Sequence, residues 1–294
     1  MLVWLNGRFV RARDARVSAL DRGLLHGDGA YDTWRTYAGV PFLTAAHVRR
    51  LAAAARALGL PAPGAAASWD RRARRLVALN GLGDAHVRLT LSRGAAGDAL
   101  APERRAAPTL LLTARPIPAD LRARQQHGVA AVLLPFARAG GVPPWGGLKL
   151  LGNASAVAGR MLAARRGAAE GLYVEPSGRV TEGTTTNVFI VERGAIVTPP
   201  CDGSILPGVT RALVVALARR ARIAVREEPL APARVRRAHE VFLTASTIEI
   251  VPVVRLDGRR VGGARPGPVT RTLQAAYAAR VRRAVTRRNS TSAR

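Results

Sequence analysis

The chain switches repeatedly between the hydrophobic spacing of strands and that of helices, which restricts it to folds that combine sheets with helices. Residues 2–10 are rich in the apolar and aromatic side chains of strands and are divided by Asn6-Gly7, a pair typical of tight hairpin turns. Residues 47–60 and 68–80 instead repeat Ala, Leu and Val every three or four positions, as amphipathic helices do. Further strands are expected at 31–37, 86–92 and 109–114. We therefore predict a small α+β domain over residues 1–116.

The second part of the chain follows a break in this periodicity. Pro116 and Pro118 interrupt the pattern, and residues 117–128 are predicted to connect two domains. The later elements expected are strands from Val129, hairpin turns at 176–178 and 192–194, a long helix after Gly208, a strand at 240–246 and a last helix from Pro268. The prediction is an α/β fold of two domains, the larger over residues 129–284, with a frayed basic tail over 285–294.

The basic residues are unusual in kind as well as number. The 294 residues include 46 Lys plus Arg against 19 Asp plus Glu, a net charge of +27, yet Lys149 is the one lysine. The arginines are scattered along the outer faces of predicted helices, and 4% aromatic residues provide few platforms on which nucleic-acid bases stack. We therefore expect these arginines to lie on a solvated surface, and we predict no nucleic-acid partner.

Several classes of site are missing from the sequence. No apolar run approaches the ~20 residues that span a bilayer, and the first residues do not resemble a signal peptide. Cys201 is the single cysteine, which excludes an internal disulfide, and the five histidines are not spaced as metal ligands. Hydrolase, phosphate-loop and dinucleotide motifs are absent as well. We expect a cytoplasmic protein with no metal and no membrane partner.

Lys149 stands out because the other 45 basic residues are arginines. Either residue can serve as a surface cation, but only a lysine amine can lose its proton and attack a carbonyl, since a guanidinium stays protonated. Glycines precede and follow this lysine in GGLKLLGNAS, where the backbone can approach a ligand closely. Lys149 is therefore the candidate for covalent catalysis, the alternative being a surface lysine that persists by chance.

Three other segments place polar groups at the ends of predicted elements. Glu182 follows a strand beside three threonines, where it either caps a turn or offers a carboxylate. Residues 209–210 begin a helix, and their amides either simply start it or bind phosphate. Residues 246–247 follow another strand and add hydroxyls. An amine, a carboxylate and a phosphate cradle together match the needs of pyridoxal 5′-phosphate: a covalent link, a partner for the ring nitrogen and an anchor for the phosphate.

These segments, in their order and spacing, resemble the class IV (fold-type IV) pyridoxal-phosphate-dependent aminotransferases, which include branched-chain and D-amino acid aminotransferases and aminodeoxychorismate lyase. The likeness covers nearly the whole chain, with 33 residues from Lys149 to Glu182. The segments that carry it are LNGRFV, DRGLLHGDGAYDTWRTYAGVPF, HVRRL, LKLLGN, VTEGTTTNVFIVERGAIVTPP, ILPGVTR and EVFLTASTIEIVPVVRLDGRRVG. The resemblance implies a two-domain fold with the cofactor in the cleft between the domains.

The resemblance also implies a role for each matching residue. Lys149 would form a Schiff base with the cofactor and, once released, carry the proton between the substrate Cα and the cofactor C4′. Glu182 would pair with the pyridine nitrogen and keep it protonated. The residues implied to bind the cofactor phosphate are Arg50, Val209, Thr210, Ser246 and Thr247. Those implied to face the substrate are Tyr31, Arg35 and Arg88, although Arg35 could equally be a solvated strand residue.

No branch of the family matches in full. D-amino acid aminotransferases bind the substrate carboxylate with an R-x-H element, but Asp98 and Leu100 occupy those places here, which counts against a D-amino acid substrate. The branched-chain enzymes are similar in TWRTY, yet Ala154 replaces the tyrosine of their N-Y-L segment and His86 replaces a substrate-facing tyrosine. Residues 92–98 are similar to a loop of the lyase branch.

The sequence thus predicts a transaminase that moves an amino group between a branched-chain or similar apolar L-amino acid and a 2-oxo acid by a ping-pong mechanism. The alternatives within the family are aminodeoxychorismate lyase and a D-amino acid or (R)-amine transaminase. From another class, the alternative is a basic nucleic-acid-binding or scaffold protein on a degenerate enzyme fold. The resemblance also implies a homodimer.

Overall fold

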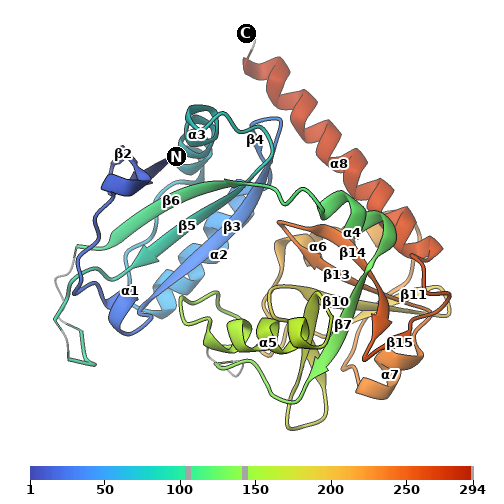
Figure 1. The fold of residues 1–294 in the computed structure, drawn as a ribbon. Coiled ribbons are helices and arrows are strands. Elements are labelled where there is room, and N and C mark those ends of the chain that lie inside the picture. Colours follow the sequence, from blue (N-terminus) through green and yellow to red (C-terminus); the bar gives the residue numbers. More distant parts are fainter. Residues whose placement is uncertain (98, 103–106, 141–144, 293–294) are drawn as a thin grey trace. The chain divides into compact units, whose positions relative to one another are not determined.

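The computed structural model describes residues 1–97, 99–102, 107–140 and 145–292, and the chain divides into two compact units (Figure 1). The first unit consists of Met1–Ile117, Leu148–Gly152 and Val281–Arg294, and the second consists of Pro118–Gly147 and Asn153–Arg280. Within the part of the chain that is described, no helix has both the length and the apolar character needed to cross a membrane.

The first unit is built on a six-stranded antiparallel sheet with the strand order β2-β1-β6-β5-β3-β4. Its strands are β1 (Leu2–Leu5), β2 (Arg8–Arg11), β3 (Gly29–Tyr37), β4 (Val40–Pro41), β5 (Ala85–Ser92) and β6 (Thr109–Pro116). Its helices are α1 (Arg22–Leu25), α2 (Thr44–Ala57) and α3 (Ala66–Leu79), with a 3-10 turn at Ala12–Asp14. The hairpin turn predicted at Asn6-Gly7 is confirmed, and both residues adopt a positive φ, 43° and 101°.

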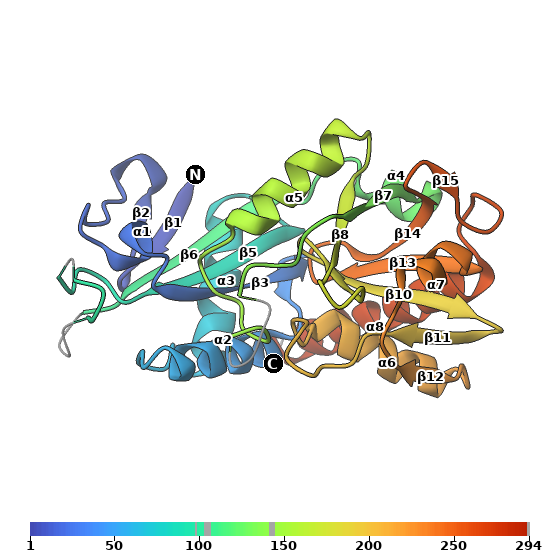
Figure 2. The same ribbon diagram turned by 90° about the horizontal axis from the view of Figure 1, so that it is seen from below.

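The two long helices of this unit, α2 and α3, cover one face of the sheet (Figure 2). The core between them includes Trp34 of β3 and Trp69 of α3, which are at most 1% exposed. Successive residues of a strand point to opposite faces, so Tyr31 lies on the face away from these helices. Arg88 of the neighbouring strand β5 pairs with Thr33 and lies on that same face. The sheet therefore carries its candidate substrate residues on the face that α2 and α3 leave uncovered.

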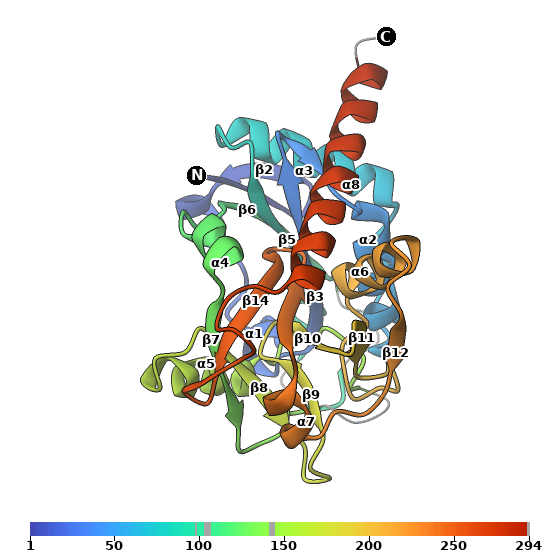
Figure 3. The same ribbon diagram turned by 90° about the vertical axis from the view of Figure 1, so that its right-hand side faces the viewer.

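The second unit is built on a nine-stranded mixed sheet in the order β12-β11-β10-β13-β14-β7-β8-β9, with β15 paired to β14. Figure 3 shows part of this order, from β12 and β11 through β10 and β14 to β7. The strands are β7 (Val129–Leu134), β8 (Glu170–Val174), β9 (Val180–Gly183), β10 (Asn187–Glu192), β11 (Ala195–Thr198), β12 (Val225–Glu227), β13 (Glu240–Ala245), β14 (Glu249–Leu256) and β15 (Arg259–Arg260). The helices are α4 (Leu121–His127), α5 (Ala154–Arg165), α6 (Val209–Arg220), α7 (Pro232–Arg237) and α8 (Pro268–Ser292), whose last residues belong to the first unit. Glu182 of β9 also pairs with Asn187 of β10. Because of this pairing, the six strands from β10 to β9 in the order above form a closed ring.

Helices of the second unit lie on both sides of its sheet. α5 packs on β7 and β8, while α6 packs on β12 and β13 from the opposite side (Figure 2). The apolar interior includes Leu172, Ile190 and Val241, each at most 1% exposed. α6 begins at Val209, directly after Pro207-Gly208, as predicted. Because the strands form a closed ring, residues at the ends of β9, β10 and β13 lie near the start of α6, to which they are joined by hydrogen bonds.

At three places the structure shows local features that were not predicted from the sequence. Residues 117–128 contain α4, a helix of seven residues, which the prolines just before it conceal from an analysis of periodicity. Residues 148–152 group with the first unit because Leu150 pairs with Ala30 of β3. α8 is helical as far as Ser292, where a frayed tail was expected, since no proline or glycine interrupts residues 284–292. The predicted domain limits themselves stay a prediction.

Candidate active site

The segment that carries Lys149 is attached to β3 by backbone hydrogen bonds. The Tyr31 N–H donates to the Lys149 carbonyl at 3.0 Å, and the Leu151 N–H donates to the Gly29 carbonyl at 3.0 Å. The lysine Nζ lies 4.6 Å from the centre of the Tyr31 ring, a cation–π contact. The one lysine of the chain is therefore held at a defined place beside a strand that is more than a hundred residues away in the sequence.

Gly29 makes this attachment possible. A Cβ atom at this position would lie 2.4 Å from the Leu91 carbonyl oxygen and 2.7 Å from Leu151 Cδ1. Any larger residue would push the Lys149 segment off β3 or separate β3 from β5. The sequence analysis did not assign a function to this glycine, although its place directly before the Tyr31 strand was a usable signal.

Arg88 is a partly buried cation beside Tyr31. Its guanidinium carbon lies 3.6 Å from the centre of the Tyr31 ring, and its Nε donates to Thr90 Oγ1 at 3.2 Å. Burial lowers the pKa of Arg88, an effect opposed by Tyr31 and reinforced by the positive charge of Arg115. Among the described residues, no carboxylate forms an ion pair with Arg88. A guanidinium placed in this way attracts an anionic ligand such as a carboxylate.

Arg35 differs from Arg88 in its surroundings, although both lie on the same face of the sheet. Its Nη2 pairs with Asp84 Oδ2 at 2.8 Å, and its guanidinium lies 4.5 Å from the centre of the Tyr37 ring. The structure thus groups Tyr31, Arg88 and Lys149, and it places Arg35 in an ion pair of its own.

Arg50 lies on α2 and is held by a carboxylate that the sequence analysis missed. Asp32 Oδ2 accepts from Arg50 Nε, and Asp32 Oδ1 accepts from Arg50 Nη2, both at 2.8 Å. His47 Nδ1 is 2.8 Å from the same Oδ1. Burial by itself would raise the pKa of the Asp32 carboxyl, but the charges and hydrogen bonds of His47 and Arg50 hold that pKa well below its usual range. The signal in the sequence was a charged residue on the core-facing side of a strand, beside Trp34.

Asp32→Asn is expected to lower the free energy of unfolding by about 3 kcal/mol at pH 7, because it removes the charge that compensates Arg50 in a buried place. A carboxyl whose pKa is lowered by folding stabilises the fold above its unfolded pKa of about 4, and this contribution is lost as the pH falls through the lower folded value. In urea unfolding, the gap between the two proteins should be constant above about pH 7, where His47 is neutral, and should shrink below about pH 4.

Asp84→Asn is the matched control, because its partner Arg35 is about as buried as Arg50, with side chains 11% and 12% exposed, whereas the Asp84 carboxylate itself is 47% exposed. It should cost no more than about 1 kcal/mol. Equal losses for the two variants at pH 7 would show that the Asp32 contacts do not stabilise the first unit.

In the second unit, Glu182 is a buried carboxylate with both oxygens engaged. It is 4% exposed, and its Oε1 forms an ion pair with Arg138 Nε at 3.1 Å without the alignment of a hydrogen bond. Its Oε2 accepts from the Leu206 N–H at 3.0 Å and from Asn187 Nδ2 at 3.4 Å. Arg138 and Asn187 were not predicted, because neither carries a motif of its own. The arrangement keeps a carboxylate oriented at the end of β9.

The candidate phosphate-binding site of the second unit lies at the first turn of α6. The N-cap residue of this helix is Gly208, which has no side chain to cap it, and the amides of Val209 and Thr210 lie at the positive end of the helix. Thr210 is 3% exposed, and its Oγ1 is 3.2 Å from Ser246 Oγ at the end of β13. Thr247 follows in the turn between β13 and β14. The structure therefore brings together the hydroxyls and amides that the sequence analysis assigned to a phosphate.

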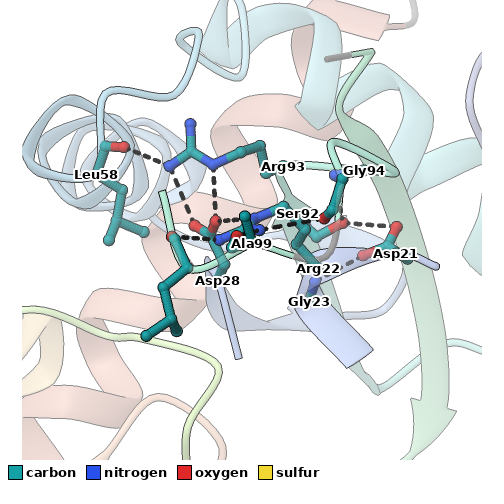
Figure 4. A network of polar contacts seen from close by, with 11 residues as sticks. Asp21, Arg22, Gly23, Asp28, Leu58, Ser92, Arg93, Gly94 and Ala99 are labelled. Carbon is teal, nitrogen blue, oxygen red and sulfur yellow. Dashed lines mark hydrogen bonds and ion pairs between the residues drawn. The ribbon is translucent and has the colours of Figure 1, made fainter. Parts of the chain in front are cut away.

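A network of buried charges organises the loop that follows β5 in the first unit (Figure 4). Arg22 donates to the carbonyls of Gly97, Ala99 and Leu100. Asp28 Oδ2 accepts from Arg22 Nε at 2.9 Å and from Arg93 Nε at 2.7 Å. These hydrogen bonds lower the pKa of Asp28 against the effect of its burial. Asp98, which the sequence analysis weighed against a D-amino acid substrate, lies outside the described residues.

Comparison with known proteins identifies the family of this chain. The family model for class IV amino-transferases matches residues 29–256. The chain belongs to the class IV aminotransferases. It is therefore a transaminase, and its cofactor is pyridoxal 5′-phosphate. Among the described residues, no group of three or more His, Cys, Asp or Glu side chains could hold a metal ion.

Relatives of this aminotransferase are known for more than one substrate. A putative branched-chain-amino-acid aminotransferase of Methanocaldococcus jannaschii is 35% identical over 93% of this chain and 94% of its own length. A D-alanine aminotransferase of Bacillus licheniformis is 31% identical over 94% of this chain and 95% of its own length. The branched-chain aminotransferase of the archaeon Thermoproteus uzoniensis, solved with norvaline, has a TM-score of 0.87 at 28% identity, over 96% of this chain and 94% of the other. These likenesses confirm the predicted fold class and family.

The residues present fit the cofactor of this family. Lys149 supplies an amine on a segment anchored to β3, and Glu182 supplies an oriented carboxylate. The uncapped end of α6, with the Thr210 and Ser246 hydroxyls beside it, suits a phosphate dianion.

Proposed function

We propose that this aminotransferase takes its amino group from a branched-chain or similar apolar L-amino acid and passes it to a 2-oxo acid by a ping-pong mechanism. The observation that carries the proposal is the grouping of Lys149, Tyr31 and Arg88 on one face of the first unit. Arg88, without a carboxylate partner among the described residues, suits the carboxylate that amino acids and 2-oxo acids share. Relatives named for branched-chain amino acids support the choice of an apolar donor.

The residues divide the work between the two units. We propose that Lys149 binds the cofactor through its amine and that, once the substrate amine has displaced it, the freed lysine takes the proton from the substrate Cα and returns it at C4′ of the cofactor. Glu182 holds a proton at the pyridine nitrogen, because a carboxylate within hydrogen-bond distance favours the charged form. When bound, pyridoxal 5′-phosphate supplies the electron sink for the pair left at Cα. The phosphate ligands in this proposal are Arg50, Val209, Thr210, Ser246 and Thr247.

The substrate residues differ in their proposed tasks. Tyr31 and Arg88 contact the substrate directly in this proposal, since both lie on the Lys149 face of the sheet. Arg35 lies on the same face, but its guanidinium already forms an ion pair with Asp84 and contacts the Tyr37 ring. In this proposal it faces the substrate while it keeps that ion pair.

We further propose that the enzyme is a homodimer, as the family resemblance implies, and that it acts in the cytoplasm, as expected from the sequence. Large apolar side chains are exposed in both units: Leu20, Leu24, Leu25, Val157 and Met161. Exposed apolar side chains that gather into a patch mark protein interfaces, and Val157 and Met161 stand four positions apart on α5. Light scattering during gel filtration should give twice the chain mass of 31.1 kDa, and a monomeric mass would refute the dimer.

A half-reaction screen tests the donor. Each of L-Leu, L-Glu, D-Ala and (R)-1-phenylethylamine is added alone to the yellow holoenzyme, and the visible band of the bound cofactor is followed. L-Leu should bleach the band and release its 2-oxo acid without a second substrate, whereas D-Ala should not. The D-Ala arm is needed because a D-alanine aminotransferase is among the relatives. Bleaching by D-Ala but by neither L-amino acid would refute the proposed substrate.

A further inference from the structure

The Glu182 carboxylate is joined directly to the turn that precedes α6. Its Oε2 accepts from the Leu206 N–H at 3.0 Å, while Asn187 Nδ2 donates to the Leu206 carbonyl at 2.9 Å. The same Asn187 nitrogen lies 3.4 Å from Glu182 Oε2. Both polar backbone groups of Leu206 are thus held by this pair of side chains. The carboxylate assigned to the ring nitrogen and the turn assigned to the phosphate form one hydrogen-bonded assembly.

Asn187 occupies a rigid place in the sheet. It pairs with Glu182 across β9 and β10, which is the pairing that closes the ring of six strands. On its other side it pairs with Thr244 of β13. Asn187 and Glu182 are each 4% exposed, so water competes little for their hydrogen bonds. A change in the direction of this amide must therefore be transmitted to its partners rather than absorbed by solvent.

The oxygen end of the same amide lies against the start of the helix. A Cβ atom at Gly208 would lie 2.0 Å from Asn187 Oδ1 and 3.1 Å from Arg211 Cβ. Only glycine permits so close an approach of the turn to the amide. Gly208 directly precedes Val209 and Thr210, whose amides begin α6. Asn187 therefore contacts the turn at Leu206 through its nitrogen and at Gly208 through its oxygen.

We propose that Asn187 is a positioning residue that couples the ring-nitrogen site to the phosphate site. It fixes the turn before α6 relative to the Glu182 carboxylate, so that a ligand bound at one site preorganises the other. The proposal rests on the assignment of Glu182 and residues 209–210 to the cofactor made above. Preorganisation of this kind produces a reciprocal gain in affinity, in which each ligand raises the affinity for the other by the same factor.

Two fragments of the cofactor measure this coupling separately. Pyridoxal, which lacks the phosphate, and inorganic phosphate are titrated into the cofactor-free full-length protein, each alone and each with the other at saturation. In the wild-type protein, saturating phosphate should raise the affinity for pyridoxal about 10-fold, and saturating pyridoxal should raise the affinity for phosphate equally. In Asn187→Ala, the factor should fall to about one. A residue that only stabilises the fold would lower the melting temperature without changing this factor.

Thr244→Val is the matched control. Thr244 pairs with Asn187 across the sheet, and its Oγ1 has no hydrogen-bond partner among the described residues. This variant should keep the wild-type coupling. Gly208→Ala tests the same contact from the helix side, because its Cβ would displace the Asn187 amide, and it replaces Asn187→Ala if that variant lacks a cooperative thermal transition. Gly208→Ala should also lose the coupling.

The outcomes separate this proposal from the proposed function. A wild-type protein that binds neither pyridoxal nor phosphate would refute the cofactor assignments of Glu182 and residues 209–210. A wild-type protein that binds both without coupling, or an Asn187→Ala protein that keeps the full coupling, would refute the role of Asn187 alone.

Discussion

Lys149→Arg is expected to lower kcat by about 10⁴-fold, the upper part of the range that a positioned acid–base group contributes. Arginine keeps the positive charge and the contact with the Tyr31 ring, so the fold should persist. It cannot lose a proton at accessible pH, and it therefore can neither bind the cofactor covalently nor take a proton from the substrate Cα. Single-turnover measurements with L-Leu and added cofactor report this loss without interference from product release.

Borohydride reduction provides the independent check on this variant. Because the chain has one lysine side chain, reduction of the wild-type holoenzyme should leave a phosphopyridoxyl group on the peptide that contains Lys149. Lys149→Arg should show no such addition. Arg179→Lys is a suitable control, since Arg179 is 41% exposed and pairs with Glu175; it should keep wild-type kcat and the label on Lys149, and acquire no label at position 179. Turnover of Lys149→Arg within tenfold of wild type would refute the role of this lysine.

Glu182→Gln is expected to lower kcat by about 10²- to 10³-fold. An adjacent carboxylate favours the charged form of a base by about 1–3 pKa units, and glutamine withdraws that support from the pyridine nitrogen. The side-chain amide still offers an oxygen to the Leu206 N–H, so the turn before α6 should keep its position. The loss should therefore appear mainly in kcat rather than in the affinity for the cofactor.

The pH dependence of Glu182→Gln provides a sharper readout. Without the carboxylate, the pyridine nitrogen has a lower pKa, and its protonated fraction rises as the pH falls. The deficit in kcat should consequently narrow between about pH 8 and pH 6. Glu175→Gln, a change at an ion pair with Arg179 outside the candidate site, should leave the profile unchanged. A Glu182→Gln enzyme with wild-type kcat at every pH would show that this carboxylate does not hold the ring proton.

Much of the fold could be predicted from local patterns. The strands at 31–37, 86–92 and 109–114 correspond to β3, β5 and β6, and the helix at 47–60 corresponds to α2. These elements have strong periodicity and clear turn residues at their ends. α4 and α5 were not predicted, since α4 has only seven residues and α5 exposes apolar residues such as Met161. An exposed apolar side chain weakens the amphipathic pattern on which such a prediction depends.

The reactive residues of the candidate site were predicted from the sequence, whereas the residues that hold them in place were not. Lys149 and Glu182 belong to segments with a recognisable chemical need, an amine and a carboxylate. The residues that were missed act by holding other residues in place: Asp32, Arg138 and Asn187. A role of this kind can be assigned only when the partner of the residue is known. Asp32 and Arg50 are 18 positions apart, and Asn187 and Leu206 are 19 apart.

The sequence by itself determined the kind of chemistry and the class of fold. One lysine among 45 arginines points to a reaction that needs a deprotonated amine, because a guanidinium cannot provide one. The tertiary structure alone decided that this lysine lies on Tyr31, that Arg50 is held by Asp32 and that Glu182 is bonded to the turn before α6. Hydrophobic periodicity reports on neighbours along the chain, whereas these contacts join residues that only the tertiary packing of separate elements brings together.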